Sequence, residues 1–300
     1  YSLNTTTKYA CWAGFCGPWT DEIWIQTFYN LPSSEFGIFV PVFFNWNRYF
    51  LVYRRQRTHY LSILNEIGSL LKPTFLYFTV SYHEAGIEGD THQKILPLNL
   101  FVANAGGKGN MPIMMRSFEN YPIANSTQSK YKYDLVFMGS NHTHKVRSTL
   151  LSHFQKLSNF SFYNGKSKDW RTIFKDSKAI LCPRGYGRNT FRLTEVLELG
   201  LIPIIVYDDI IYVPYYNSIK WEDFSLMVQI NPKNNISEID KIADFVNSLT
   251  SHRINTMRNK IRSMYHSHFS RNGSITQLRR FLKGGFQKSD LRCVKRLYYP

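Results

Sequence analysis

The chain has 300 residues, with 37 Lys and Arg against 21 Asp and Glu, and a formal net charge of +16 at pH 7. Hydrophobic residues make up 43% and aromatic residues 16% of the sequence. This composition excludes a disordered, collagen-like or coiled-coil protein, because each of those classes has a different bias in charge, glycine or aromatics. The sequence therefore predicts a folded, basic, globular protein with one large domain or two ordinary ones.

The first part of the chain, up to about residue 125, is rich in aromatic residues and irregular in pattern. Its apolar runs at residues 37–44 and 75–80 predict two buried strands. Helical spacing over residues 49–71, before Pro73, predicts one helix between them. Residues 104–110 are glycine-rich and are expected to form a loop, and the polar residues 125–132 are expected to form a linker.

The second part alternates apolar runs with helical patterns. Strands are expected at residues 134–138, 160–163, 179–181, 201–206 and 224–228, and helices at 142–157, 168–175, 190–199, 236–249, 252–268 and 275–282. This alternation predicts a parallel sheet wrapped by helices. We expect one domain at residues 1–128, a second at 129–268 and a helical tail at 269–300 that packs back on the first domain.

One segment carries the densest chemical signal. The strand ending at Cys182 is followed by two glycines, three arginines, a threonine at a helix start and an acid one turn later: Gly185, Gly187, Arg184, Arg188, Arg192, Thr190 and Glu195. A capped helix N-terminus binds anions, and the planar guanidinium group donates two hydrogen bonds to a phosphate. Glu195 would face paired hydroxyls such as those of a ribose. The segment therefore favours a nucleoside diphosphate. A second strand-to-helix junction, Gly139-Ser140, precedes a helix that carries Arg147.

The same segment resembles a known family. Cys182-Pro-Arg-Gly, Phe191-Arg-Leu-Thr-Glu195, Gly200-Leu-Ile-Pro-Ile-Ile, Asp208-Asp209, Val213-Pro-Tyr215 and Trp221 are similar to the donor-side signature of the exostosin family, glycosyltransferase family 47. The resemblance is specific over about residues 133–265 and includes plant, animal and algal-virus relatives. It implies an α/β fold of the GT-B type, two Rossmann-like domains facing across a cleft, with residues 1–128 as the acceptor-side domain and 129–268 as the nucleotide-sugar-binding domain. It also implies inverting transfer of a sugar from a nucleotide sugar, usually a UDP-sugar.

The resemblance also suggests roles for individual residues. Arg184, Arg188 and Arg192 are expected near the diphosphate, with Arg147 approaching from the Gly139-Ser140 junction. Glu195 is the ribose candidate, Asp208 and Asp209 reach sugar hydroxyls or shape their loop, and Asn189 and Thr190 cap the helix. Gly185 lets the backbone approach the ligand. Tyr215 and Trp221 either stack on the ligand or, more in keeping with their type, pack in the core.

The catalytic base is expected in the first domain. Residues 80–86 resemble the Ser-x-His-Asp-x-Gly region of plant members, with Glu84 in place of the usual Asp. Single-displacement inversion needs a base that takes the proton of the acceptor hydroxyl. Glu84 is the first candidate, and His83 and Asp90 are alternatives. His83 and Glu84 could equally serve only to order their loop.

No metal or other cofactor is expected to be required. Enzymes that hold UDP through a divalent metal commonly use Asp-x-Asp, whereas this chain has only the adjacent pair Asp208-Asp209 and the triplet at residues 88–90. The expected partners are a UDP-sugar donor and an oligosaccharide or glycoprotein glycan acceptor, in a monomer or in a homo- or hetero-oligomer. A Golgi lumen location is expected if an N-terminal anchor has been removed, and six Asn-x-Ser/Thr sequons agree with it. A viral origin would instead place the protein in the cytoplasm.

Two other functions fit parts of the sequence. An inactive exostosin-like subunit or glycan-binding protein would keep the donor site without turnover. A polyanion or nucleic-acid binder would use the positive charge alone. The basic residues are spread along the chain, however, and no zinc-finger spacing or RNA-binding aromatic motif occurs, so nucleic acid is not expected. Neither the transferred sugar (glucuronic acid and xylose are candidates) nor the acceptor follows from the sequence.

Overall fold

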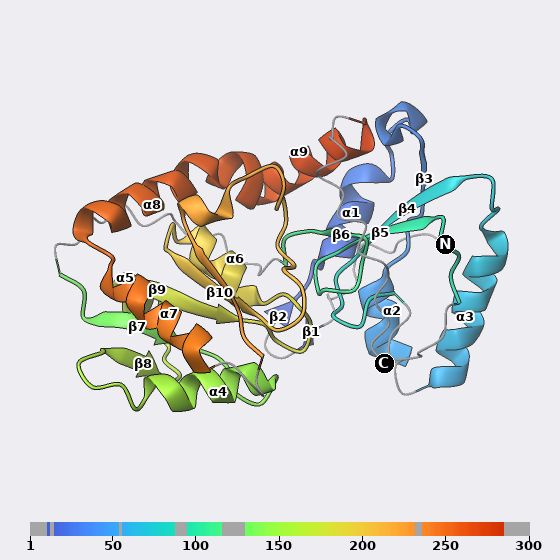
Figure 1. Cartoon of the computed structure of the whole chain (residues 1–300). Coiled ribbons are helices and arrows are strands. Elements are labelled where there is room, and N and C mark those ends of the chain that lie inside the picture. The colour runs from blue at the N-terminus through green and yellow to red at the C-terminus, as the bar shows by residue number, and fades with distance from the viewer. Residues whose placement is uncertain are drawn as a thin grey trace. The chain divides into compact units, whose positions relative to one another are not determined.

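The computed structural model describes residues 11–12, 15–53, 56–87, 95–115, 130–231 and 236–284. They form two compact units (Figure 1). The first holds the described residues up to 115 together with residues 279–284, and the second holds those from 130 to 278. Each unit has helices and a parallel sheet, which confirms the expected α/β class with two Rossmann-like domains. The GT-B arrangement, in which the domains face each other across a cleft, stays a prediction, as do the exact domain boundaries.

The described part of the first unit is built on a parallel sheet with strand order β3-β4-β5-β6. Its strands are β3 (Phe39–Pro41), β4 (Leu76–Ser81), β5 (Leu100–Asn104) and β6 (Met111–Pro112), and its helices are α1 (Thr20–Phe28), a 3-10 turn (Ser33–Phe36), α2 (Trp46–Tyr53) and α3 (Arg57–Leu70). An antiparallel pair, β1 (Cys11–Trp12) and β2 (Phe15–Cys16), precedes them and sets Cys11 opposite Cys16 in register. The structure does not describe the side chains of this pair.

Large aromatic side chains fill the first unit's core. Trp24 lies against Phe28, Phe36 and Phe78, with ring centroids 4.5, 6.0 and 5.4 Å away. Aromatic side chains bury large areas, so few and short strands suffice to close this core. The buried indole of Trp46 donates its N–H to Thr79 Oγ1 at 2.8 Å, which satisfies the one polar atom that the ring brings inside.

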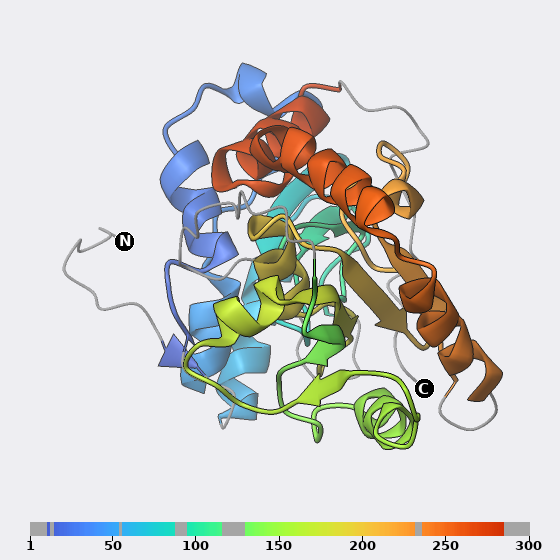
Figure 2. The same cartoon turned by 90° about the vertical axis from the view of Figure 1, so that its left-hand side faces the viewer.

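The second unit contains a five-stranded parallel sheet with strand order β11-β10-β9-β7-β8. The strands are β7 (Tyr133–Phe137), β8 (Phe162–Asn164), β9 (Ser177–Pro183), β10 (Pro203–Tyr207) and β11 (Leu226–Gln229). The helices are α4 (Lys145–Phe154), α5 (Trp170–Lys175), α6 (Phe191–Glu198), a 3-10 turn (Trp221–Asp223), α7 (Ile236–Asn247), α8 (Ser251–Met264), a π turn (Tyr265–Phe269) and α9 (Arg271–Leu282), which ends in the first unit. Both views place the sheet between α4 and α8 (Figures 1 and 2).

The central strands of this sheet carry continuous apolar runs because helices cover both faces. Ile180, Leu181, Ile204 and Val206 are at most 2% exposed, although neighbours along a strand point to opposite faces. α6 begins at Thr190, whose hydroxyl accepts the Arg192 N–H, and this confirms the predicted cap. The uninterrupted apolar runs and the cap together explain why the sequence predicts this unit well.

The first unit differs from the prediction in three places. The single helix expected over residues 49–71 is wrong: α2 ends at Tyr53 and α3 begins at Arg57, and Gln56 between them has φ −111° and ψ 66°, outside the helical region. α1 was not predicted, and neither were β5 and β6. The expected linker at residues 125–132 lies mostly outside the described residues.

The last turn of α9 belongs to the first unit. Phe281 lies against Phe39, Phe78 and Phe101, with ring centroids 5.5–5.8 Å apart. A Cβ on Gly37, which has φ +56°, would come within 2.3 Å of the Leu282 carbonyl oxygen. Only glycine therefore allows this close approach. Among the described residues, the helices are too short or too polar for any of them to span a bilayer.

Candidate functional site

The site predicted from the sequence lies at the point where the strand order of the second sheet reverses. β8 follows β7 on one side, whereas β9, β10 and β11 lie on the other. In open parallel sheets, ligands bind outside the carboxyl ends of the strands at this reversal. The segments that follow β7, β9 and β10 are Met138–Ser140, Arg184–Gly187 and Asp208-Asp209. Most of the predicted donor-side residues therefore belong to adjacent strand ends of one unit.

Arg147 on α4 ties two of these strand ends together. Its Nε donates to the carbonyl of Arg184 at 2.8 Å, and its Nη2 to the carbonyl of Pro183 at 3.2 Å, both after or at the end of β9. Its Nη1 donates to the carbonyl of Ser140 at 2.8 Å, beyond the end of β7. The side chain is buried, and burial lowers the pKa of Arg147 to about 10, which leaves it charged at pH 7. Arg147 thus belongs to the predicted cluster and fixes the backbone on both sides of the reversal.

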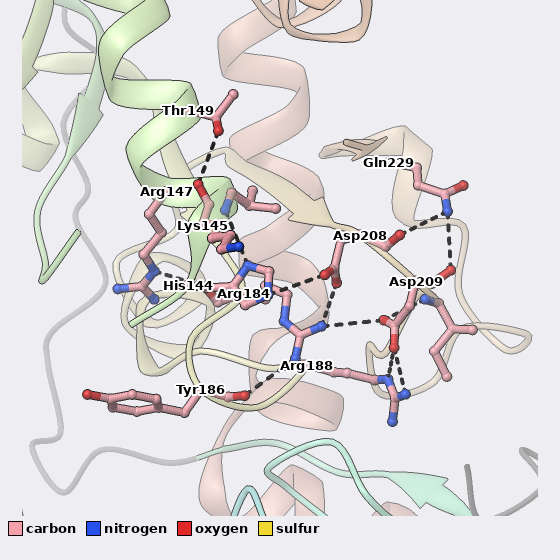
Figure 3. A network of polar contacts seen from close by, with 12 residues as sticks. His144, Lys145, Arg147, Thr149, Arg184, Tyr186, Arg188, Asp208, Asp209 and Gln229 are labelled. Carbon is pink, nitrogen blue, oxygen red and sulfur yellow. Dashed lines mark hydrogen bonds and ion pairs between the residues drawn. The ribbon is translucent and has the colours of Figure 1, made fainter. Parts of the chain in front are cut away.

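Arg184 and Arg188 form ion pairs with the two aspartates that follow β10 (Figure 3). Arg184 Nη1 contacts Asp208 and lies 3.7 Å from Asp209, while Arg188 Nε and Nη2 are both 2.6 Å from Asp209 Oδ2. The arginine side chains are 4–5% exposed, whereas those of Asp208 and Asp209 are 21% and 30% exposed. The carboxylates therefore present more of the site's surface than the guanidinium groups that hold them.

The electrostatics keep Asp209 ionised. Burial alone would raise its pKa, but the hydrogen bond from Arg188, the N–H of Ile210 and the charges of Arg188 and Arg184 outweigh burial and lower it. Gln229 Nε2 donates to the main-chain carbonyls of Asp208 and Asp209 at 3.3 Å, which anchors the same turn to β11. The pair Asp208-Asp209 is thus a fixed, negatively charged group at the end of β10.

Arg192 and Glu195 form a second pair on the first turns of α6. Arg192 Nη2 also donates to the Met138 carbonyl at 2.7 Å, and its guanidinium lies over the ring of Phe174, 4.7 Å from the centroid. Glu195 is buried. This pair lies near the end of β7, while Asp208 and Asp209 follow β10. The candidate ribose and sugar contacts therefore follow different strands, on either side of β9.

The loop between β9 and α6 holds the remaining predicted residues. Asn189 is buried, and its Oδ1 accepts the Thr190 N–H at 2.8 Å. Thr190 Oγ1 lies 3.5 Å from Arg147 Nη2, which links the cap of α6 to α4. A Cβ on Gly185 would meet Arg147 Nη2 at 3.5 Å and Asn189 O at 3.6 Å, an ordinary contact distance. Gly185 is therefore not required here by crowding within the chain.

His144 was not predicted, yet it belongs to the same network. Its Nδ1 accepts the Val146 N–H at the start of α4, so Nε2 carries the proton of the neutral ring and faces Asp208 Oδ2 at 3.3 Å. Burial, with the charges of Arg184 and Arg147, lowers the pKa of His144 against the opposing effect of Asp208. Its position just before a helix, one residue after Thr143, is the only signal in the sequence. From this position alone, His144 could not be distinguished from a histidine on the protein surface.

In the first unit, His83 and Glu84 follow β4, as predicted. His83 Nδ1 accepts the Ala85 N–H at 3.0 Å, so its Nε2 faces Glu84 Oε2 at 3.6 Å. His83 is buried, and the Glu84 side chain is 32% exposed. Asp90 lies outside the described residues. Of the two candidates that the structure describes, Glu84 is the one that combines a carboxylate with access to solvent.

The glycine-rich loop after β5 supports this turn. A Cβ on Gly106 would lie 2.4 Å from Glu84 Cα and 2.5 Å from Glu84 N. Asn104 Nδ2 donates to the carbonyl of His83 at 3.0 Å, and its Oδ1 accepts the N–H groups of Gly107 and Lys108. The backbone that carries Glu84 is therefore packed directly on the glycine-rich loop.

Packing accounts for two further residues that the sequence had suggested as ligand contacts. Trp221 is fully buried, donates its indole N–H to the Pro214 carbonyl at 3.1 Å and lies against Phe224 and Phe269. Tyr215 lies against His268 and Phe269. Over the part of the chain that the structure describes, no group of three His, Cys, Asp or Glu side chains could hold a metal ion.

The region of the chain that contains these residues is similar to known proteins. Residues 110–244 match the model of the exostosin GT47 domain. A probable glucuronosyltransferase of Oryza sativa subsp. japonica is 30% identical over 108 residues, 36% of this chain and 24% of that protein. A probable β-1,4-xylosyltransferase of Arabidopsis thaliana is 36% identical over 74 residues, 24% of this chain and 17% of that protein.

These matches cover about a quarter or less of each relative's length. Among solved structures, the crystal structure of TarM is similar with a TM-score of 0.38 and 10% identity, over 74% of this chain and 58% of that chain. The family match contains the strand ends of β7, β9 and β10 with Arg147, Arg184 and Asp208. Over residues 110–244, the chain is thus similar to the exostosin GT47 domain.

Proposed function

We propose that this protein is an inverting glycosyltransferase that moves a sugar from a UDP-sugar to a hydroxyl of a glycan acceptor. The observation that carries the proposal is the arginine cluster at the strand-order reversal of the second sheet, inside the region that matches the exostosin domain. The relatives named above are a probable glucuronosyltransferase and a probable xylosyltransferase. Both names describe transfer of a sugar and support the reaction class.

On the donor side, Arg184, Arg188 and Arg192 meet the charge of the diphosphate. Their present partners are the carboxylates of Asp208, Asp209 and Glu195, which hold each guanidinium in a fixed orientation. Donors that are already oriented cost little reorganisation when charge develops on the leaving group. Because guanidinium groups supply this charge, we propose that no divalent metal is required. Transfer that persists in excess EDTA would agree with this, and its loss would contradict it.

Asp208 and Asp209 are suited to the sugar of the donor. Both directly follow β10, both are partly exposed, and the pKa of Asp209 is lowered. An ionised carboxylate accepts hydrogen bonds from two or more hydroxyls. Selection between sugars by such contacts depends on which hydroxyls they reach, so the identity of the sugar is a question for a substrate panel.

The reaction is a single displacement. The acceptor oxygen forms a bond to the anomeric carbon while the bond from that carbon to the phosphate oxygen breaks, and UDP leaves with the electron pair. The acceptor proton goes to a base, for which we propose Glu84. His83 Nε2 faces this carboxylate and orients it. Removal of a positioned general base costs about 10²–10⁴ in rate.

The test combines binding and turnover. Thermal unfolding is measured with and without UDP, and transfer is measured with a panel of UDP-sugars. We expect UDP to stabilise the protein, and Glu84→Gln to keep that stabilisation while transfer falls at least about 100-fold. Glu66→Gln, an exposed position on α3, is the matched control and keeps both. Absence of any UDP stabilisation, or parental turnover in Glu84→Gln, would refute the donor site or the base, respectively.

A second function is favoured by one observation. Glu84 replaces the Asp of the plant motif, and the extra methylene could leave the carboxylate out of place. An exostosin-like binding subunit would then bind UDP and glycan without transfer. A chain that UDP stabilises but that transfers no sugar, even after Glu84→Asp, would support this second function.

A further inference from the structure

One exposed aromatic side chain stands out in the second unit. Among the described residues, nine large hydrophobic side chains are strongly exposed, and eight of them lie in the first unit. The ninth is Tyr186, which is 68% exposed. It lies between Gly185 and Gly187 in the loop that follows β9, within the arginine cluster. A ring exposed at the ligand-binding edge of a parallel sheet is in the right place to contact a ligand.

The backbone that carries this ring is anchored. The Tyr186 carbonyl accepts a hydrogen bond from Arg184 Nη2 at 3.4 Å, and the Gly185 N–H donates to the Asn189 carbonyl at 3.4 Å. Arg147 Nε holds the Arg184 carbonyl at 2.8 Å, two residues before Tyr186. The ring therefore projects from a fixed main chain, so a ligand that stacks on it meets a preformed surface.

The ring points to one particular side of the cluster. Figure 3 shows Tyr186 directed away from Asp208 and Asp209, with the guanidinium of Arg184 between them. In the same view (Figure 3) Arg147, which contacts Ser140 beyond β7, also lies on the side of Arg184 away from the two aspartates. The aspartates and the ring thus lie on opposite sides of Arg184. A molecule whose charged centre sits at Arg184 would have one end at the carboxylates and its other end at the ring.

A nucleotide sugar has this layout: a flat heterocycle at one end, a charged diphosphate in the middle and a ring of hydroxyls at the other. Hydroxyls pair with carboxylates, whereas a heterocyclic base offers a π-face to an aromatic ring. Building on the function proposed above, we infer that Tyr186 is the stacking surface for the base of the donor nucleotide. Asp208 and Asp209 then face the transferred sugar.

The experiment measures binding by calorimetry for UDP and for inorganic pyrophosphate, which has the charge but no base. Three proteins are compared: the wild type, Tyr186→Ala and Tyr186→Phe. Loss of one stacked base weakens binding about 5- to 150-fold. We expect Tyr186→Ala to lose UDP affinity by this factor and to bind pyrophosphate like the wild type. Tyr186→Phe keeps the ring and should bind UDP within about twofold of the wild type.

Each other result overturns the inference in a recognisable way. Equal weakening of UDP and pyrophosphate in Tyr186→Ala would assign the residue to the loop backbone, not to the base. Unchanged binding of both UDP and pyrophosphate in Tyr186→Ala would remove the ring from the nucleotide site. A wild type that binds neither UDP nor pyrophosphate would refute the proposed function itself, which distinguishes the two failures.

Discussion

Arg147 offers the sharpest test of how the donor site is held together. We consider Arg147→Met, which keeps an unbranched side chain beside the ring of Phe137 but removes every donor. Three main-chain carbonyls, those of Ser140, Pro183 and Arg184, lose the hydrogen bond from Arg147. Loss of a hydrogen bond to a buried acceptor costs about 1–3 kcal/mol. Pro183 and Arg184 are buried, whereas Ser140 is exposed to solvent, so at the lower end for each buried carbonyl the second unit loses about 2 kcal/mol of unfolding free energy.

The assay is thermal and urea unfolding of the purified chain. A loss of about 2 kcal/mol lowers the Tm by about 4–8 °C in a protein of this size class. Arg147→Lys keeps the charge, but one ammonium nitrogen replaces three guanidinium nitrogens, so we expect most of the same loss. Arg253→Met is the matched control: Arg253 is exposed on α8, and its replacement should change stability by less than about 0.5 kcal/mol.

An Arg147→Met variant that unfolds within about 1 kcal/mol of the wild type would refute this role of the three hydrogen bonds. An Arg147→Lys variant that behaves like the wild type would also refute it, because the charge alone would then explain the role of Arg147. In that case the direct contact with a diphosphate that the sequence suggested would be the better description of this residue.

Three further predictions concern pH and packing. Burial raises the pKa of Asp21 from 3.8 to about 7, so between these pH values the folded state binds more protons than the unfolded state. Stability therefore falls as pH rises from 3.8 to about 7, by about 4 kcal/mol in all. When urea unfolding is compared at pH 5 and pH 8, Asp21→Asn should lack most of the fall in stability that the wild type shows between them, and an unchanged fall would count against the assignment. The pKa of His144 is lowered instead, so its contribution to stability is complete above about pH 6.5 and is lost as pH falls through the pKa of the folded state. The variant His144→Asn, which can still cap α4, should therefore lose less stability in acid than the wild type. Gly106→Ala places a Cβ 2.4 Å from Glu84 Cα and should lower the Tm and transfer, whereas the Tm of Gly185→Ala, whose Cβ meets nothing nearer than 3.5 Å, should change little; equal Tm values would contradict this.

The second unit follows closely from its sequence, for physical reasons that can be named. Strands covered on both faces must be apolar throughout, so Ile204–Val206 and Ile180–Cys182 are recognisable without knowledge of their neighbours. The cap at Thr190 is also local, because a hydroxyl and a nearby N–H form it. The strand ends that these elements define bring the predicted donor-side residues together.

The first unit was harder to predict because its order depends on distant contacts. α1 opens with Asp21, which is fully buried and accepts the Asn47 N–H at 2.6 Å, a partner 26 residues away. Buried acids at a helix start are read from sequence as surface residues. The break between α2 and α3 at Gln56 has no proline or glycine to mark it. Tertiary packing therefore decided these elements.

The contacts between the site residues could not be predicted from the sequence either. Three arginines near a helix start indicate an anion site, but their pairing with Asp208, Asp209 and Glu195 depends on which strands are neighbours. The main-chain contacts of Arg147 depend on the same strand order. Residue type thus predicted the chemistry, while topology determined which residue contacts which.

The central claim is that the arginine cluster at the reversal of the second sheet binds the diphosphate of a nucleotide. A crystal structure of the chain with UDP tests it most directly. We predict that phosphate oxygens lie about 3 Å from guanidinium nitrogens of Arg184, Arg188 or Arg192. UDP bound elsewhere on the chain, with these three arginines still paired only with Asp208, Asp209 and Glu195, would contradict the claim.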